Sequence, residues 1–155
     1  MISAQVTLTQ PLKDGRQFVA QTASGHHLLL DDAHGATGPK PIELVAVALA
    51  ACTAFDVITI LRQKHHQNVT AYEVRVEADQ AERPPQVFTA VRIHHVVTGH
   101  SIDSAALEQA IRLSEEKYCA VGGMVKHTAT FTTTQEIREE RAEAPSPSEP
   151  PLVRP

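Results

Sequence analysis

The first thirty residues alternate between apolar and polar positions, which is the period of a strand with one buried face. Residues 2–8 read Ile-Ser-Ala-Gln-Val-Thr-Leu. Residues 17–22 and 27–31 are predicted to be two further strands, separated from their neighbours by short polar turns at 13–16 and 24–25. The three segments together predict a small antiparallel meander.

A long apolar segment follows a loop that is rich in Gly and Pro. The sequence PIELVAVALAACTAFDVITIL, residues 41–61, predicts a helix that runs to about residue 65, with Pro41 suited to its first turn. Apolar residues occupy more than one face of this helix, and a two-layer monomer of this size covers such a helix poorly. We therefore expect an intertwined homodimer with this helix at its centre. One apolar stripe consists of Leu44, Val47, Ala48, Ala51, Phe55, Ile58 and Leu61.

The second half of the chain predicts two long strands, a second helix and a last strand. The two strands cover residues 69–78 and 87–98, the helix covers 105–118, and the Thr-rich strand covers 126–134. Gly122 and Gly123 are expected to break or bend the continuation of the helix. The order βββ-α-ββ-α-β predicts an α+β fold, with antiparallel sheets packed on the long apolar helix.

Composition limits the number of domains and the kinds of partner. A chain of 155 residues, 42% of them hydrophobic, is most simply one domain. Residues 138–155 are charged and rich in Pro, which predicts a disordered tail after a domain at residues 1–137. The net charge of −4 gives no electrostatic reason to expect nucleic acid or an anionic membrane surface as a partner. The N-terminus lacks a signal-peptide pattern, and the apolar run contains Glu43 and Asp56. We therefore expect no membrane span and a cytoplasmic protein.

The chain has two cysteines, Cys52 and Cys119, which are 67 residues apart and lack CxxC spacing. Both lie in segments expected to line one core, so they can meet in space, and a thiol pair in a reducing compartment indicates redox chemistry. The alternative is that each is a small hydrophobic core residue. Asp56, four residues after Cys52, is expected either to accept a hydrogen bond from a partner subunit or to disfavour the thiolate by like charge.

The nine histidines form no metal-binding pattern in the sequence. Three adjacent pairs place neighbouring side chains on opposite faces of a strand, and no HxH or HxxxH spacing occurs. Neither cysteine has a second ligand at short spacing, and neither a phosphate-binding glycine loop nor a serine-nucleophile elbow is present. We therefore expect no metal and no cofactor; the alternative is a zinc site whose ligands come together from distant positions, for which the sequence signal is weak.

Two separated motifs, each centred on a cysteine, carry a resemblance to a known family. GPKPIELVAVALAACTAFDVITIL and, after two strands, LSEEKYCAVGGMV resemble the OsmC/Ohr family of thiol peroxidases, and in particular its YhfA-like subgroup. The resemblance covers about residues 2–137. It implies an OsmC-like fold, an intertwined homodimer, and reduction of organic hydroperoxides in oxidative or osmotic stress defence. It assigns peroxidatic attack to Cys52 and disulfide formation to Cys119. The reductant would be a dithiol, such as a dihydrolipoyl protein or a small thiol.

The resemblance also implies that a cation activates Cys52. Burial disfavours a thiolate, and the helix dipole has faded by the middle of a helix. In the peroxidase branches an arginine from the N-terminal strands, held by an acid at the start of the central helix, provides the charge. Arg16 is the candidate here, with Lys13 and Lys40 as lesser alternatives, and Glu43 is its expected partner. The alternatives are a solvated turn for Arg16 and a helix N-terminal role for Glu43.

Two classes of function therefore remain open. The first is a thiol-dependent organic hydroperoxide reductase with an apolar pocket at a dimer interface. The second is a non-enzymatic or slow redox-sensing stress protein on the same fold, which binds a small apolar ligand.

Overall fold

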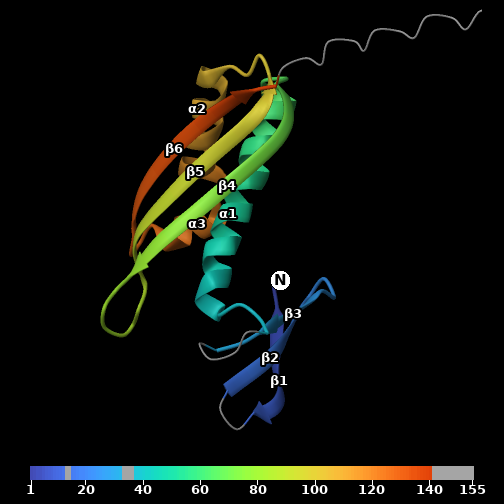
Figure 1. Ribbon diagram of the computed structural model, residues 1–155, viewed down its shortest axis with the longest axis vertical. Helices are drawn as coiled ribbons and strands as arrows, with labels where there is room; N and C mark the ends of the chain where they lie inside the picture. Colours follow the sequence, from blue (N-terminus) through green and yellow to red (C-terminus); the bar gives the residue numbers. More distant parts are fainter. Residues whose placement is uncertain (13–14, 33–36, 141–155) are drawn as a thin grey trace, which may run out of the picture.

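The computed structural model describes residues 1–12, 15–32 and 37–140, which form two three-stranded sheets and a group of helices (Figure 1). This arrangement confirms an α+β architecture with two sheets and a long helix. In chain order the elements are β1 (Ala4–Leu12), β2 (Gly15–Thr22), β3 (His27–Leu30), α1 (Pro41–Thr59), η1 (Ile60–Lys64), β4 (Asn68–Gln80), β5 (Phe88–His100), α2 (Ser104–Leu113), η2 (Ser114–Tyr118), α3 (Ala120–Val125) and β6 (Thr130–Glu139).

The first sheet is the antiparallel meander that the alternating pattern predicts, in the order β1-β2-β3. It lies beyond the N-terminal end of α1, apart from the other sheet (Figure 1). Its apolar side chains Val6 and Leu8 are exposed. The predicted turn covers residues 13–16. Lys13 and Asp14 lie outside the described residues, and Gly15 and Arg16 begin β2.

The second sheet has the order β4-β5-β6, and the direction of its last strand differs from the prediction. β4 and β5 are antiparallel, but β6 pairs with β5 in parallel. A parallel neighbour requires a crossover connection, and the helical segment from α2 to α3 provides it. The last strand begins at Thr130 rather than residue 126, because residues 126–128 form a turn. It continues to Glu139, two residues into the segment expected to be tail; residues 141–155 lie outside the described part.

The helices follow the predicted segments with one correction. The helix expected over 105–118 is present as α2 followed by the π-helical segment η2, and the long helix continues past α1 as η1. The predicted break at Gly122 and Gly123 is wrong, since both lie inside α3. The chain is instead interrupted at Cys119, whose extended backbone (ψ 96) ends η2 and begins α3.

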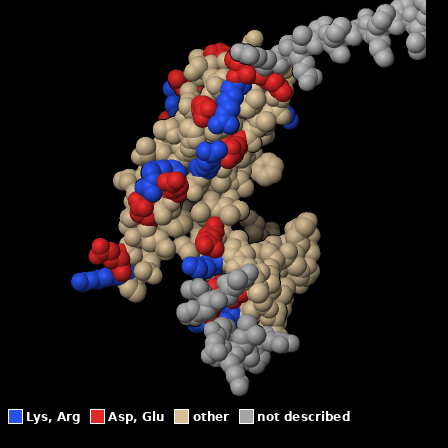
Figure 2. All heavy atoms as spheres, in the orientation of Figure 1, with Lys and Arg blue, Asp and Glu red and all other residues tan. Residues whose placement is uncertain are grey.

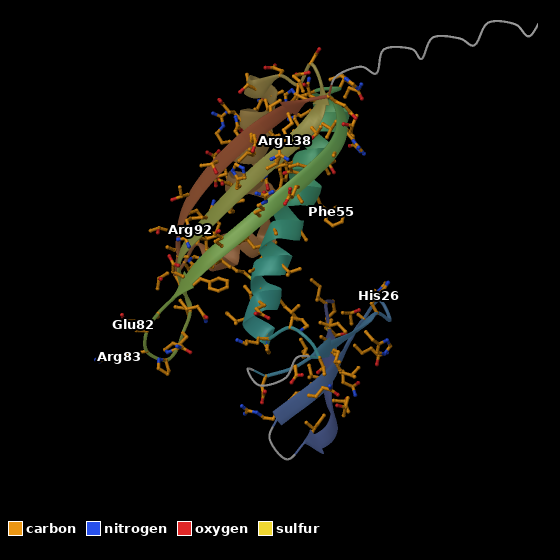
Figure 3. The ribbon with its side chains drawn as sticks, in the orientation of Figure 1. His26, Phe55, Glu82, Arg83, Arg92 and Arg138 are labelled. Carbon is orange, nitrogen blue, oxygen red and sulfur yellow. The ribbon has the colours of Figure 1, made fainter. Side chains whose placement is uncertain are left out.

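Helix α1 packs one side against the second sheet and leaves another side uncovered. The uncovered side contains much of the apolar stripe noted in the sequence: Val47 is 61% and Phe55 74% exposed, and Figure 3 shows Phe55 projecting outward from the helix. Burying apolar surface is worth roughly 25 cal/mol per Å², so this side is a favourable surface for a partner. The residues that α1 and η1 bury in the core are Leu49, Thr53, Val57 and Leu61.

By length and composition the helical stretch Pro41–Lys64 could also cross a membrane. Its mean hydropathy is 2.4 over the most apolar 18 residues, and 28% of that window is buried. The core helix of a soluble protein meets the same criterion, so this property alone indicates little.

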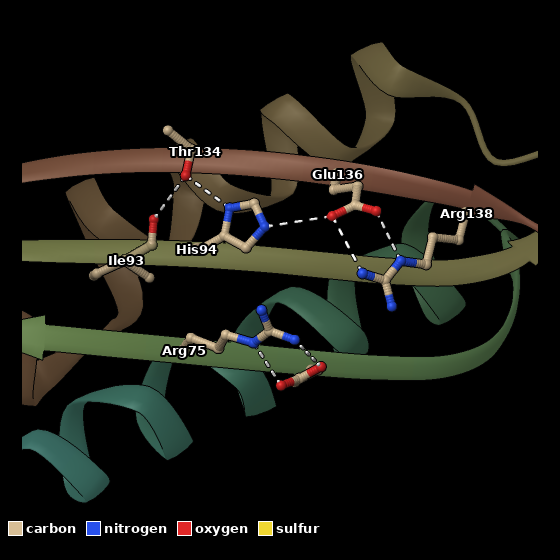
Figure 4. Close-up of polar contacts among 7 residues, drawn as sticks. Arg75, Ile93, His94, Thr134, Glu136 and Arg138 are labelled. Atoms are coloured by element: carbon tan, nitrogen blue, oxygen red, sulfur yellow. Dashed lines mark hydrogen bonds and ion pairs between the residues drawn. The ribbon is translucent and has the colours of Figure 1, made fainter.

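Charged side chains gather on the outer face of the second sheet (Figure 2). Figure 4 shows part of this network: His94 and Arg138 both contact the Glu136 carboxylate, at 3.6 Å and 2.7 Å. Arg75 pairs with Glu73 on the neighbouring strand β4. This solvated face leaves the inner face of the sheet, which packs on the helices, as the site of the core.

Candidate redox site at Cys52 and Cys119

The fold brings together the two cysteines that are 67 residues apart in the sequence. Cys52 lies in the second half of α1 and Cys119 at the N-terminus of α3. Their Sγ atoms and a carboxylate oxygen of Asp56 all lie within 4.8 Å of one another. Both cysteines are free thiols. Because a disulfide needs sulfurs about 2 Å apart, the pair can bond after a modest movement of the side chains.

Cys119 is buried at the start of α3, where its Sγ accepts a hydrogen bond of 3.2 Å from the Gly122 N–H. The backbone of Gly122 passes close to this sulfur: a Cβ at this position would lie 3.2 Å from the sulfur, which would have to move by a few tenths of an ångström. Burial and the hydrogen bond with Cys52 raise the pKa of the Cys119 thiol to about 12, while the Gly122 N–H opposes the shift. Cys119 is therefore a protonated thiol at neutral pH in the reduced protein.

A buried hydroxyl holds Asp56 beside the cysteines. Ser114 Oγ hydrogen bonds with Asp56 Oδ2 at 3.0 Å and with Thr53 Oγ1 at 3.1 Å. A carboxylate only accepts, so the Ser114 proton goes to Asp56. Ser114 and Thr53 are both buried. The sequence reading missed these two residues, although Ser114 continues the buried face of Leu107 and Ile111 at helical spacing.

A pocket of about 350 Å³ opens next to the site. Asp56 forms part of its wall, and so does Tyr118, the residue before Cys119. Most of the exposed lining surface is apolar, which favours an apolar molecule in this pocket beside Asp56. The lining residues are Phe55, Asp56, Thr59, Ile60, Lys64 and Tyr118.

Arg16 and Glu43, the expected activating pair, lie elsewhere in the single chain. Arg16 is exposed on β2, 3.6 Å from Asp32, and lines a separate pocket of about 580 Å³ between the first sheet and the start of α1. Glu43 accepts a hydrogen bond of 2.9 Å from the backbone N–H of Lys40. Cys52 comes nine residues after Glu43 in the helix, which is a rise of about 14 Å along the helix axis. Among the described groups that shift the pKa of Cys119 there is no cation.

Comparisons with known proteins agree with this arrangement. The family model described as OsmC-like protein matches residues 33–134. The chain is 38% identical over 124 residues to Protein YhfA of Escherichia coli K12, which covers 80% of this chain and 92% of that protein. A hypothetical protein from Aquifex aeolicus VF5 has a similar structure, with TM-score 0.79 and 27% identity, covering 91% of this chain and 98% of that one.

A more distant neighbour has a name that states a function. The organic hydroperoxide resistance protein OhrB of Bacillus subtilis matches with TM-score 0.59 and 13% identity, over 88% of this chain and 98% of that one. At this identity the match concerns the fold alone. The family match over most of the domain and the similarity to Protein YhfA rest on sequence as well, and they show that this chain belongs to the OsmC-like protein family.

Proposed function

We propose that this protein reduces organic hydroperoxides, with Cys52 as the attacking thiolate and Cys119 as the resolving thiol. The observation that supports this most directly is the proximity of the two sulfurs, which lie within 4.8 Å although their residues are far apart in sequence. The fold shared with proteins named for organic hydroperoxide resistance is compatible with it.

The reaction balances with a peroxide and a dithiol. The Cys52 thiolate attacks one peroxide oxygen, the O–O bond breaks, and the alcohol leaves after taking up a proton. Cys52 is then a sulfenic acid. The Cys119 sulfur attacks the Cys52 sulfur, water leaves, and a disulfide forms. An external dithiol reduces this disulfide by thiol exchange and is itself oxidised.

The surroundings of the two thiols fit this division of roles. Cys52 is half-buried and adjoins Asp56 in the pocket wall, whereas Cys119 is 7% exposed. The raised pKa of Cys119 keeps its proton available for the hydrogen bond with the Cys52 sulfur.

The proposal includes a homodimer formed through the uncovered side of α1. Phe55 and Val47 on this side are exposed, and Phe55 also lines the pocket beside Asp56. A second copy that covers this surface would enclose the pocket. It also offers the route by which Arg16, held by Glu43, reaches a Cys52 thiolate, because neither residue contacts the site within one chain.

We further propose a cytoplasmic stress-defence role with a dihydrolipoyl protein or a small thiol as reductant. Reduced thiols persist in that compartment, so the free Cys52–Cys119 pair is ready to react. The apolar lining of the pocket favours organic hydroperoxides over hydrogen peroxide.

The test treats the reduced full chain with an equimolar amount of cumene hydroperoxide and counts free thiols. We expect the loss of two thiols per chain, no loss in Cys52→Ser, and a sulfenic acid trapped on Cys52 in Cys119→Ser. Unchanged thiols in the wild-type chain would refute the peroxidase proposal. Complete but slow oxidation, without turnover when dithiol is supplied, would favour the redox-sensing alternative.

A second measurement tests the activating cation. Arg16→Ala should slow the thiol oxidation at neutral pH, and Arg83→Ala is the matched control. Arg83 lies in the loop between β4 and β5, far from the site (Figure 3). Equal oxidation rates in the two variants would remove Arg16 from the mechanism.

A further inference from the structure

The groups that form the redox site also make a set of metal ligands. Two thiol sulfurs and one carboxylate oxygen, from Cys52, Cys119 and Asp56, lie within 4.8 Å of one another. Soft thiolates with one oxygen ligand suit a thiophilic divalent cation. We propose that these three residues bind such a cation, with Zn²⁺ as the reference ion, whenever both cysteines are reduced. This binding does not depend on peroxide reduction.

The spacing fits a tetrahedral ion with little movement. Zn²⁺ bonds to sulfur at about 2.3 Å and to carboxylate oxygen at about 2.1 Å, which places tetrahedral ligand atoms roughly 3.6–3.8 Å apart. Because the three ligand atoms already lie within 4.8 Å of one another, they would have to approach one another by about 1.2 Å at most. Cys52 and Asp56 stand one helical turn apart on α1, so they face the same point in space.

The surroundings hold two of the three ligands in place. Ser114 engages Asp56 through Oδ2, which leaves Oδ1 for a metal. The backbone N–H of Gly122 points at the Cys119 sulfur and stabilises it as a thiolate. Such outer hydrogen bonds orient metal ligands and are a regular feature of metal sites.

The site also has an opening for a fourth ligand. Asp56 forms part of the wall of the 350 Å³ pocket, so water or another small ligand can reach the proposed ion from that side. Three protein ligands and one exchangeable position are the arrangement of a zinc site that stays accessible.

Metal binding and disulfide formation exclude each other at this site. The ion needs both Cys52 and Cys119 as thiolates. The disulfide removes both sulfurs as ligands. A bound ion therefore protects the thiols from peroxide, and oxidation releases the ion.

The test titrates the reduced full chain with Co²⁺, because a sulfur-to-cobalt charge-transfer band reports thiolate ligands and not histidine alone. We expect one Co²⁺ per chain, displaced by Zn²⁺. The band should be lost in Cys52→Ser and in Cys119→Ser. Asp56→Asn should weaken binding at least about tenfold. Glu116→Gln, which removes an exposed carboxylate from η2, is the control and should bind as the wild type does.

Two results would overturn the proposal: no charge-transfer band in the wild-type chain, or a band that Asp56→Asn leaves at full affinity. Protection of both wild-type thiols from alkylation by Zn²⁺ gives a second readout that needs no variant. Neither measurement uses peroxide, so failure here and failure of the peroxidase proposal are separate outcomes.

Discussion

A buried histidine makes the stability of this protein sensitive to acid. His95 lies on the inner face of β5 with no exposed surface, and Tyr72 lies 2.6 Å away, its hydroxyl facing the imidazole Nδ1. If the Tyr72 hydroxyl donates this bond, the imidazole proton is on Nε2, and this atom is buried without a hydrogen-bond partner among the described residues. Burial, with a smaller contribution from the charge of His94, lowers the pKa of His95 to about 4.

The size and sign of the effect follow from proton linkage. In the unfolded chain His95 has its ordinary pKa of about 6.5, so between about pH 6.5 and pH 4 the unfolded state binds a proton that the folded state does not. This contribution to stability is complete above pH 6.5 and is lost as the pH falls. One pKa unit corresponds to about 1.4 kcal/mol, so the loss down to pH 4 is about 3 kcal/mol.

Urea unfolding at a series of pH values measures this loss. Because carboxylates also titrate near pH 4, the informative quantity is the difference between the wild type and His95→Gln. The variant should be less stable at neutral pH, and its stability should fall by about 3 kcal/mol less between about pH 7.5 and pH 4. His94→Gln is the matched control, since His94 is the adjacent residue on the solvated face (Figure 4). Parallel pH curves for wild type and His95→Gln would refute the reasoning.

Three further predictions concern assembly and packing. Phe55→Asp places a charge on the uncovered side of α1, so sedimentation at micromolar concentration should show a dimer for the wild type and a monomer for the variant; two monomers would contradict the dimer proposal. Ser114→Ala removes the hydrogen bond to the Asp56 carboxylate and should lower the free energy of unfolding by about 1–3 kcal/mol in urea. Gly99→Ala would place a Cβ 2.2 Å from the backbone oxygen of Asn68, and thermal unfolding should reveal a loss of about 3 kcal/mol; an unchanged midpoint would show that β4 and β5 can separate there.

The sequence predicted the elements better than it predicted how they pair. The meander, the long helix and the two long strands follow from apolar periodicity, which is a local property. The direction of β6 does not, because it depends on the path of the α2–α3 crossover in three dimensions. The helix across Gly122 was missed because glycine usually weakens helices. There the Gly122 N–H donates a hydrogen bond to the Cys119 sulfur, which begins the helix in spite of that propensity.

The buried side of α1 was equally hard to predict. When a helix is apolar on several sides, periodicity does not show which side is buried. The stripe that contains Phe55 was therefore as good a candidate for the buried side as the stripe that contains Leu49. The meeting of Cys52 and Cys119 was predictable, since each lies in a segment that must enter the core. The role of Ser114 was not predictable: its spacing after Leu107 and Ile111 indicates burial, but it does not separate a site serine from one that the core tolerates.

The uncovered surface of α1 and the proposed redox site adjoin each other. Phe55 belongs to the exposed side of α1, its neighbour Asp56 lies beside both sulfurs, and the two residues share one pocket. A partner that covers Phe55 would therefore also cover the pocket beside Asp56. No cation is among the groups that shift the pKa of Cys119 in the described part of the chain. If a second copy provides both the cover and Arg16, loss of the dimer and loss of peroxide reactivity should occur together. The cysteines of Phe55→Asp should then be oxidised as slowly as those of Arg16→Ala. A monomer that still reacts at the wild-type rate would show that peroxide reactivity does not depend on the dimer.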